Sequence, residues 1–301
     1  MKHSGDSLPR HVIEMLEAIE SDNRSGAAEL LEKAAAVYVA ASDGPEPAPE
    51  TSVLFVNSIS AALRKAQPGM AGLLNLVREV ETAVRRPDSI GPLALAARAA
   101  SEFAVRASRN TTAVAALAAE LIAPGAVILT HSRSSTVLAG LLEAARRGQS
   151  FSLIATESRP MLEGRQLAES ASGAGVQVSM IVDSAAALVM DRVDLVLVGA
   201  DRVTPELVLN KIGTRLIAMS AHDLGVPIYC LADTSKFIAF QQAAQQNPDP
   251  PGFEVWPDHP PGISIINRYF EEVPLALFTS IVTENGSISP SDASWLAANS
   301  R

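Results

Sequence analysis

Short apolar runs alternate with stretches of helical periodicity between Ala126 and Ala232. Short runs rich in Val, Ile and Leu are typical of strands that are buried on both faces of a parallel sheet. The expected strands, in chain order and ending with the last clear one, are Ala126–Leu129, Phe151–Ala155, Val178–Val182, Asp194–Val198 and Ile228–Ala232. The helices expected between them are Ser135–Arg147, Gly164–Gly173, Ser184–Met190 and Arg215–Leu224. This alternation predicts right-handed βαβ units and an α/β fold with a parallel sheet.

The first part of the chain is expected to be helical. Its apolar residues recur with a period close to 3.6, and no alternating strand pattern interrupts them. The expected helices are His11–Ile19, Ala27–Ala41, Leu54–Ala66, Met70–Arg85 and Pro92–Ile122. The proline-rich stretch Asp43–Glu50 predicts a linker. We therefore expect a helical domain over residues 1–122, followed by a domain with a parallel sheet over residues 123–301.

Polar residues follow the carboxyl end of every expected strand. In open α/β sheets these ends share one edge, and ligands bind there. Asp201 comes just after one strand, and Lys211 lies just before the helix expected at Arg215–Leu224, which Thr214 can cap. A lysine beside a helix amino terminus is suited to binding phosphate. Alternatively, Asp201 is a solvated turn residue and Lys211 a surface lysine.

The composition narrows the classes of function. A formal net charge of -9 fits poorly with direct nucleic-acid binding. The single cysteine, Cys230, excludes an internal disulfide and a cysteine-rich metal site, and we expect it to be a small core residue. No apolar run is long enough to span a membrane, so we expect a soluble, cytoplasmic protein.

Neither a metal nor another cofactor is indicated. His222 and His259 have no partner at the spacing of metal ligands. No GxGxxG motif follows an expected strand, so the standard dinucleotide fingerprint is absent. We therefore expect a protein without a cofactor.

Several runs of the sequence resemble one protein family. The runs are ILTHSRSS, ATESRPMLEGRQLA, IVDSAAALVMDRVDLVLVGADRV, LNKIGT and ADTSKF. They resemble the alpha, beta and delta subunits of eukaryotic translation initiation factor 2B and the related ribose-1,5-bisphosphate and methylthioribose-1-phosphate isomerases. The resemblance covers nearly the whole chain. It implies a helical amino-terminal domain, a Rossmann-like carboxyl-terminal domain, a sugar-phosphate pocket between them, and a homodimer.

The resemblance also implies a set of site residues. The isomerases pair a cysteine with the aspartate of the GAD motif; here the aspartate is Asp201 and the cysteine position holds Ser132. These two are the candidate catalytic residues. The candidate substrate-binding residues are His131, Arg133, Arg159, Gly164, Asn210 and Lys211. We expect Ser132, Arg159, Asp201 and Lys211 to line one cleft at the carboxyl ends of the parallel strands.

Ser132 decides between two functional interpretations, a binding protein and an isomerase. A serine hydroxyl is seldom ionised without a neighbouring base, whereas a thiolate forms readily, and His131 could be that base. We therefore predict a protein that binds a phosphorylated pentose or a nucleotide, with a regulatory role or weak catalysis. The alternative is an aldose–ketose isomerase acting on a C1-phosphorylated ribose, with Asp201 as general acid/base. The intact GAD and NKIGT motifs leave this alternative open.

Overall fold

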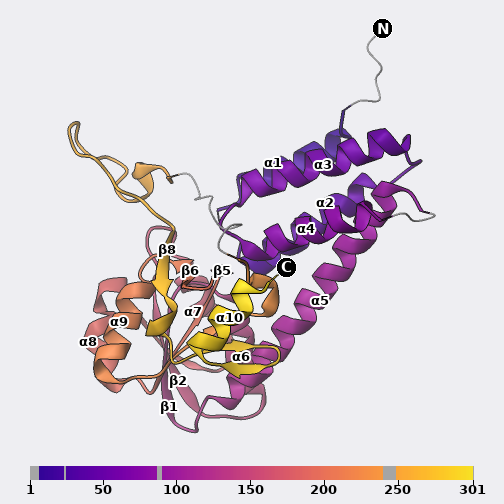
Figure 1. Ribbon diagram of the computed structural model, residues 1–301. Coiled ribbons are helices and arrows are strands. Elements are labelled where there is room, and N and C mark those ends of the chain that lie inside the picture. Colours follow the sequence, from indigo (N-terminus) through magenta and orange to yellow (C-terminus); the bar gives the residue numbers. More distant parts are fainter. Residues whose placement is uncertain (1–6, 24, 87–89, 240–248, 301) are drawn as a thin grey trace. The chain divides into compact units, whose positions relative to one another are not determined.

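The computed structural model describes residues 7–23, 25–86, 90–239 and 249–300 (Figure 1). The contacts within the chain divide it into two compact units, Met1–Arg109 and Asn110–Arg301. The boundary between the units falls within one long helix, α5 (Pro92–Glu120).

The first unit is helical, as the sequence predicts. Besides the first part of α5, its helices are α1 (Arg10–Glu20), α2 (Ala27–Ala41), α3 (Pro49–Ala66) and α4 (Ala71–Val84). Their apolar faces bury large side chains such as Tyr38, Ile59 and Leu76. The prediction of a linker up to Glu50 is wrong at its end, because α3 begins at Pro49. A proline is well suited to the first helical position, where its missing N–H is not needed.

The second unit contains a seven-stranded sheet in the order β10-β9-β7-β4-β1-β2-β3, with every pair parallel except β9–β10. The strands are β1 (Ala126–Thr130), β2 (Phe151–Thr156), β3 (Gln177–Ile181), β4 (Leu195–Gly199), β7 (Ile228–Leu231), β9 (Ser280–Thr283) and β10 (Gly286–Ile288). The α/β fold and its five expected strands are confirmed. β9 and β10, which follow the last clear strand of the sequence, were not predicted and extend the sheet.

Both faces of this sheet are buried at its centre. Along β4, Leu195 and Leu197 face one apolar cluster while Val196 and Val198 face another, which is the period-2 alternation of a strand. The end of α5 packs on the first face with α6 (Ser135–Arg146) and α7 (Gly164–Gly173). The second face is covered by α8 (Ala186–Val189), α9 (Thr214–Leu224) and α10 (Pro290–Ala298). Each buried Val or Leu side chain contributes about 1.5–3 kcal/mol to folding.

A second, three-stranded antiparallel sheet has the order β5-β6-β8. Its strands are β5 (Arg202–Val203), β6 (Leu207–Lys211) and β8 (Phe270–Pro274). The hairpin of β5 and β6 begins after Asp201, whose backbone N–H donates to the Leu209 carbonyl at 2.9 Å. The hairpin therefore turns the chain back after Asp201, so that Asp201 and the region of Lys211 lie side by side. The sequence did not predict this sheet.

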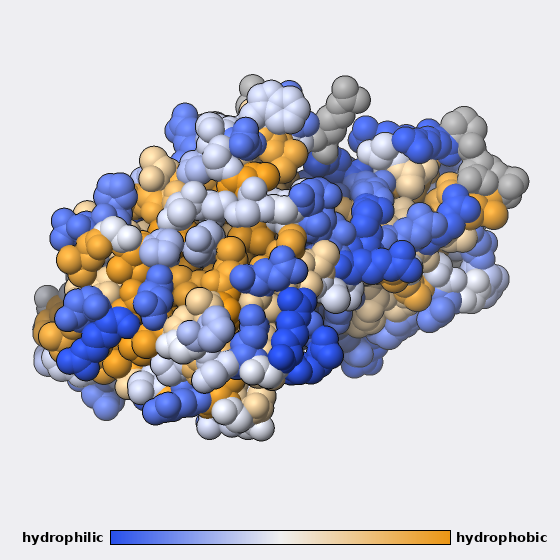
Figure 2. Space-filling view, turned by 90° about the horizontal axis from the view of Figure 1, so that it is seen from below, coloured by the Kyte–Doolittle hydropathy of each residue, from blue (hydrophilic) through white to orange (hydrophobic). Residues whose placement is uncertain are grey.

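Apolar side chains are exposed on α8 and α9. Leu188 is 79% exposed, and Leu216, Met219 and Leu224 are each at least half exposed. Seen from below, hydrophobic residues gather on the left of the molecule, the side on which α8 and α9 lie in Figure 1 (Figure 2). Among the helices in the described ranges, none has the length and apolar character needed to cross a membrane.

Candidate functional site

His131, directly after β1, is a buried residue whose two ring nitrogens both contact protein atoms. Its Nε2 lies 2.7 Å from the Ile212 carbonyl oxygen and its Nδ1 lies 2.6 Å from the Thr156 hydroxyl. A carbonyl can only accept, so Nε2 carries the proton and Nδ1 accepts from Thr156. Burial lowers the pKa of His131. The ring is thus neutral, and its two nitrogens contact Thr156 and Ile212 rather than Ser132.

Gly213 makes room for this ring. A Cβ at Gly213 would lie 3.0 Å from two ring atoms of His131, and its φ of +104° is a conformation that other residues rarely adopt. The glycine of the NKIGT run therefore allows the turn before α9 to pass close to the end of β1.

Ser132 is held in place by its backbone and its hydroxyl. Its N–H donates to Ser158 Oγ at 2.7 Å, and its Oγ donates to Glu163 Oε1 at 3.2 Å. Three non-glycine residues of this region have positive φ: Ser132 at 66°, Ser158 at 64° and Leu162 at 60°. Such conformations cost roughly 1–3 kcal/mol each and cluster at functional sites. The backbone strain therefore lies at Ser132, which stands at the cysteine position of the isomerases, and at two residues near it.

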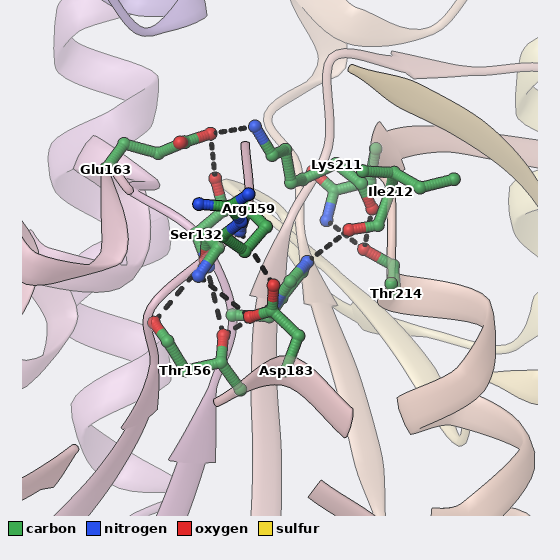
Figure 3. Close-up of polar contacts among 12 residues, drawn as sticks. Ser132, Thr156, Arg159, Glu163, Asp183, Lys211, Ile212 and Thr214 are labelled. Carbon is green, nitrogen blue, oxygen red and sulfur yellow. Dashed lines mark hydrogen bonds and ion pairs between the residues drawn. The ribbon is translucent and has the colours of Figure 1, made fainter. Parts of the chain in front are cut away.

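Glu163 links Ser132 to Lys211 (Figure 3). The Lys211 Nζ lies 2.5 Å from Glu163 Oε1, and the ammonium also lies 5.5 Å from the centre of the Tyr269 ring. The Lys211 side chain is only 5% exposed, so the reading of Lys211 as a surface lysine is wrong. Sequence reasoning missed Glu163, which stands beside the predicted Gly164 at the start of α7.

Asp201 lies just past the end of β4 and is partly buried. Burial raises its pKa from 3.8 to about 6, although the nearby ammonium groups of Lys236 and Lys211 act in the opposite direction. Lys236 is itself buried, in the single helical turn that follows β7. A carboxyl group with a pKa near 6 can both accept and donate a proton around neutral pH.

Arg159 belongs to a loop that Asp183 anchors. The two Asp183 carboxylate oxygens accept the backbone N–H groups of Ser158 and Arg159, each at 2.7 Å. The exposed Arg159 guanidinium donates to the Val255 carbonyl at 3.1 Å. The loop backbone is therefore fixed, while the guanidinium keeps solvent access. Arg133 lies between β1 and α6 and is partly buried.

Gly164 is required by close packing at the start of α7. A Cβ at this position would lie 1.9 Å from the Thr156 carbonyl oxygen, well inside contact distance. The glycine thus allows α7 to begin directly against the end of β2. This places Glu163 near Ser132.

The amino terminus of α9 differs from the expectation that Thr214 caps it. The N-cap residue is Gly213, and the Thr214 hydroxyl donates to the Lys211 carbonyl at 2.6 Å. The buried Asn210 side chain donates to the same hydroxyl at 2.9 Å. Thr214 and Asn210 therefore fix the turn that presents Lys211.

A carboxylate occupies the free N–H groups of this helix end. Glu271 Oε1 accepts from the Gly213 N–H at 2.7 Å and from the Arg215 N–H at 2.9 Å. A carboxylate is favourable at a helix amino terminus for the same reason as a phosphate. The Gly213 and Arg215 N–H groups are therefore already bonded to Glu271 and are not open to an anionic ligand.

The structure brings Ser132 and Lys211 together through Glu163, with Asp201 within electrostatic reach of Glu163 and Lys211. Cys230 is fully buried on β7, as expected for a core residue, and burial raises its thiol pKa to about 12. Lys236 and Asp201 lie within electrostatic reach of this thiol. Within the described ranges, no group of three or more His, Cys, Asp or Glu residues could hold a metal ion.

Comparison with known families gives the relationships of this chain. The model of the Initiation factor 2 subunit family, IF-2B, matches residues 12–290. The chain belongs to the IF-2B family. Its resemblance to this family, noted in the sequence, is confirmed.

Relatives of this IF-2B protein carry two kinds of names. It is 32% identical to a Pyrococcus furiosus protein named translation initiation factor eIF-2B subunit 2-like, over 94% of this chain and 98% of the relative. It is also 32% identical to the 5-deoxyribose 1-phosphate isomerase of Moorella thermoacetica, over 94% of this chain and 87% of the relative. Ribose 1,5-bisphosphate and methylthioribose-1-phosphate isomerases are further relatives.

The fold of this IF-2B protein matches a solved structure of the family. The crystal structure of the translation initiation factor eIF-2B of Pyrococcus horikoshii aligns with a TM-score of 0.83 at 29% identity. The alignment covers 95% of this chain and 99% of the other. The family therefore includes both initiation-factor subunits and sugar-phosphate isomerases by name.

Proposed function

We propose that this IF-2B protein binds a phosphorylated pentose or a nucleotide at the carboxyl edge of its parallel sheet, with little or no isomerase activity. The observation that carries the proposal is the state of Ser132. Its hydroxyl donates to Glu163, whose charge is already balanced by Lys211, and His131 is bonded at both nitrogens. Neither Glu163 nor His131 is therefore left as a strong base that could ionise the serine.

The positively charged side chains at the carboxyl edge of the parallel sheet support phosphate binding. Lys211 and Lys236 are both buried, and a buried ammonium makes a strong charge-assisted hydrogen bond to an anionic oxygen. The exposed guanidinium of Arg159 adds a planar donor suited to phosphate. These groups favour a small phosphorylated ligand.

The second candidate function is isomerisation of a C1-phosphorylated ribose. The reaction moves a proton between C1 and C2 after the ring opens, so it needs a group that accepts and returns a proton near neutral pH. Asp201 favours this candidate, because its pKa of about 6 suits general acid/base catalysis. The missing thiol at Ser132 weighs against it.

Calorimetry combined with a turnover assay tests the proposal. Wild-type protein is titrated with ribose 1-phosphate, ribose 1,5-bisphosphate and AMP, and each sugar phosphate is then followed by proton NMR for conversion to the ketose. We expect at least one ligand to bind and turnover to be slow or absent. Lys211→Ala should weaken binding about ten- to a hundredfold, the loss of one charge-assisted contact of about 1.5–3 kcal/mol.

The exposed lysine Lys65, in the helical unit, provides the control, and Lys65→Ala should bind as wild type does. Rapid turnover by wild-type protein would refute the proposal in favour of the isomerase. Absence of binding by all three ligands would refute both candidate functions.

We also propose that the protein forms a homodimer. Closed two-fold assemblies are the commonest state of soluble oligomers, and exposed apolar patches often mark protein interfaces. The apolar side chains on α8 and α9 provide such a surface.

A further inference from the structure

We propose that Glu163 competes with the phosphate of the ligand for Lys211, and so determines which ligands this site accepts and how tightly. The inference rests on the proposed function, since it concerns the same site. It assigns a specificity-determining role to Glu163, which the sequence analysis did not single out as a site residue.

The contacts of Glu163 are those that a phosphate oxygen would make. Its Oε1 lies 2.5 Å from the Lys211 ammonium and accepts from the Ser132 hydroxyl at 3.2 Å. A phosphate oxygen accepts from the same two kinds of donor. The carboxylate therefore occupies the position of an anionic ligand group on Lys211 (Figure 3).

The second oxygen of Glu163 is poorly satisfied. Its Oε2 is buried and has no hydrogen-bond partner among the described residues. Burying an acceptor without a hydrogen-bond partner is unfavourable, because the acceptor loses its contacts with water. Glu163 also makes no side-chain cap on its own helix, although it is the N-cap residue of α7. Release of the carboxylate would therefore relieve an unsatisfied atom and leave no cap broken.

The burial of the two partners indicates which one moves. The Lys211 side chain is 5% exposed, whereas the Glu163 side chain is 18% exposed. The Lys211 ammonium also lies 5.5 Å from the centre of the Tyr269 ring, a contact that does not involve Glu163. Glu163 is thus the partner that can turn toward solvent, while Lys211 remains at the site.

The charges around Lys211 favour such a displacement. Asp201 lies within electrostatic reach of the Lys236, Lys211 and Arg202 cations and of the Glu163 carboxylate. Arg202 is already paired with Glu272, at 3.5 Å. A phosphate monoester brings about 1.5–2 further negative charges. The other anion position, at the start of α9, is filled by Glu271 through two backbone N–H groups. Of these two positions, we expect a phosphate to enter the one at the Glu163–Lys211 pair.

Glu163→Gln tests the competition, because it removes the charge and keeps the size of the side chain. Binding of ribose 1-phosphate, inorganic phosphate and ribose is measured by calorimetry on the full-length protein. We expect the variant to bind ribose 1-phosphate and inorganic phosphate at least about tenfold more tightly than wild type, with binding of ribose unchanged. Glu163→Ala should act in the same direction if the amide variant does not fold, as judged from its thermal melting.

Glu157 provides a matched control. It is also 18% exposed and ion-paired, with Arg165 at 3.0 Å, and it lies in the loop before α7. Glu157→Gln should leave phosphate binding unchanged. If wild type binds ribose 1-phosphate but Glu163→Gln and Glu163→Ala bind it no more tightly, the competition is refuted and the proposed function stands. If the variants tighten ribose equally, the effect does not arise from phosphate and the inference is also refuted. If no protein binds a phosphorylated probe, the inference and the proposed function both fail.

Discussion

Replacing Asp201 with asparagine should make the protein more stable at neutral pH. Burial raises the pKa of Asp201 from 3.8 to about 6, so the folded state binds this proton more tightly than the unfolded state. When folding raises the pKa of a carboxyl group, the protein becomes less stable as the pH increases from the pKa of the unfolded state to the pKa of the folded state. Above pH 6 the ionised Asp201 therefore opposes folding.

The size of the effect follows from the two pKa values. A difference of one pKa unit corresponds to about 1.36 kcal/mol, so the change from 3.8 to about 6 amounts to about 3 kcal/mol at pH 7.5. An asparagine does not ionise, and Asp201→Asn should raise the free energy of unfolding by about this amount. The advantage should shrink as the pH falls below 6 and nearly vanish close to pH 4.

Urea denaturation at several pH values measures the effect. Both tryptophans, Trp256 and Trp295, lie in the unit that contains Asp201, so their fluorescence together with circular dichroism reports its unfolding. The exposed Asp191 provides the control, because Asp191→Asn should change the stability by no more than about 0.5 kcal/mol. Equal stability of wild type and Asp201→Asn at pH 7.5 would refute the argument that burial perturbs Asp201.

Three further changes have definite expected results. Ser132→Cys should gain isomerase activity on ribose 1,5-bisphosphate, and adding Asp201→Asn to it should abolish that activity. Adding Glu163→Gln instead should increase the activity, because a carboxylate 3.2 Å from the side chain disfavours a thiolate. Wild-type turnover that Ser132→Ala leaves unchanged would contradict this prediction. Gly164→Ala should lower the melting temperature by several degrees, since a Cβ there meets the Thr156 carbonyl at 1.9 Å and overpacking costs about 1–3 kcal/mol or more, whereas Gly173→Ala on the same helix, with nothing within 4 Å, should not. Analytical ultracentrifugation at micromolar concentration should show a dimer, and a Leu216→Glu variant should shift it toward the monomer; a monomeric wild type would count against the assembly.

Local patterns predict the centre of the seven-stranded sheet well, because β1, β2, β4 and β7 are short apolar runs that are buried along most of their length. The three-stranded sheet was not predicted because part of its pairing is not local. Its central strand, β6, pairs with β8, and Phe270–Pro274 lies far along the chain from β6. β5 has only two residues, too few for any alternation to be visible. The β5–β6 hairpin nevertheless brings Lys211 back beside Asp201, which the sequence indicated only through the position of both after apolar runs.

The contact between Glu163 and Lys211 is an example of a site feature that the sequence alone does not predict. A glutamate at the start of a helix is ordinarily explained by local effects, such as capping or the helix dipole. Its contact with Lys211 depends on the return of β6 and on the close approach of Gly164 to the end of β2. His131 is a similar case, because its partners Thr156 and Ile212 come from two other segments and reveal a structural role that the motif alone does not.

The central claim is that a phosphorylated pentose binds where Glu163 now meets Lys211, beside Ser132 and Asp201. A crystal structure of the protein with ribose 1-phosphate tests it most directly. We predict the phosphate on the Lys211 ammonium in place of the Glu163 carboxylate, and the sugar hydroxyls on Asp201 and Ser132. A ligand bound away from these residues, or a site that stays empty with the Glu163–Lys211 pair intact at saturating ligand, would contradict the account.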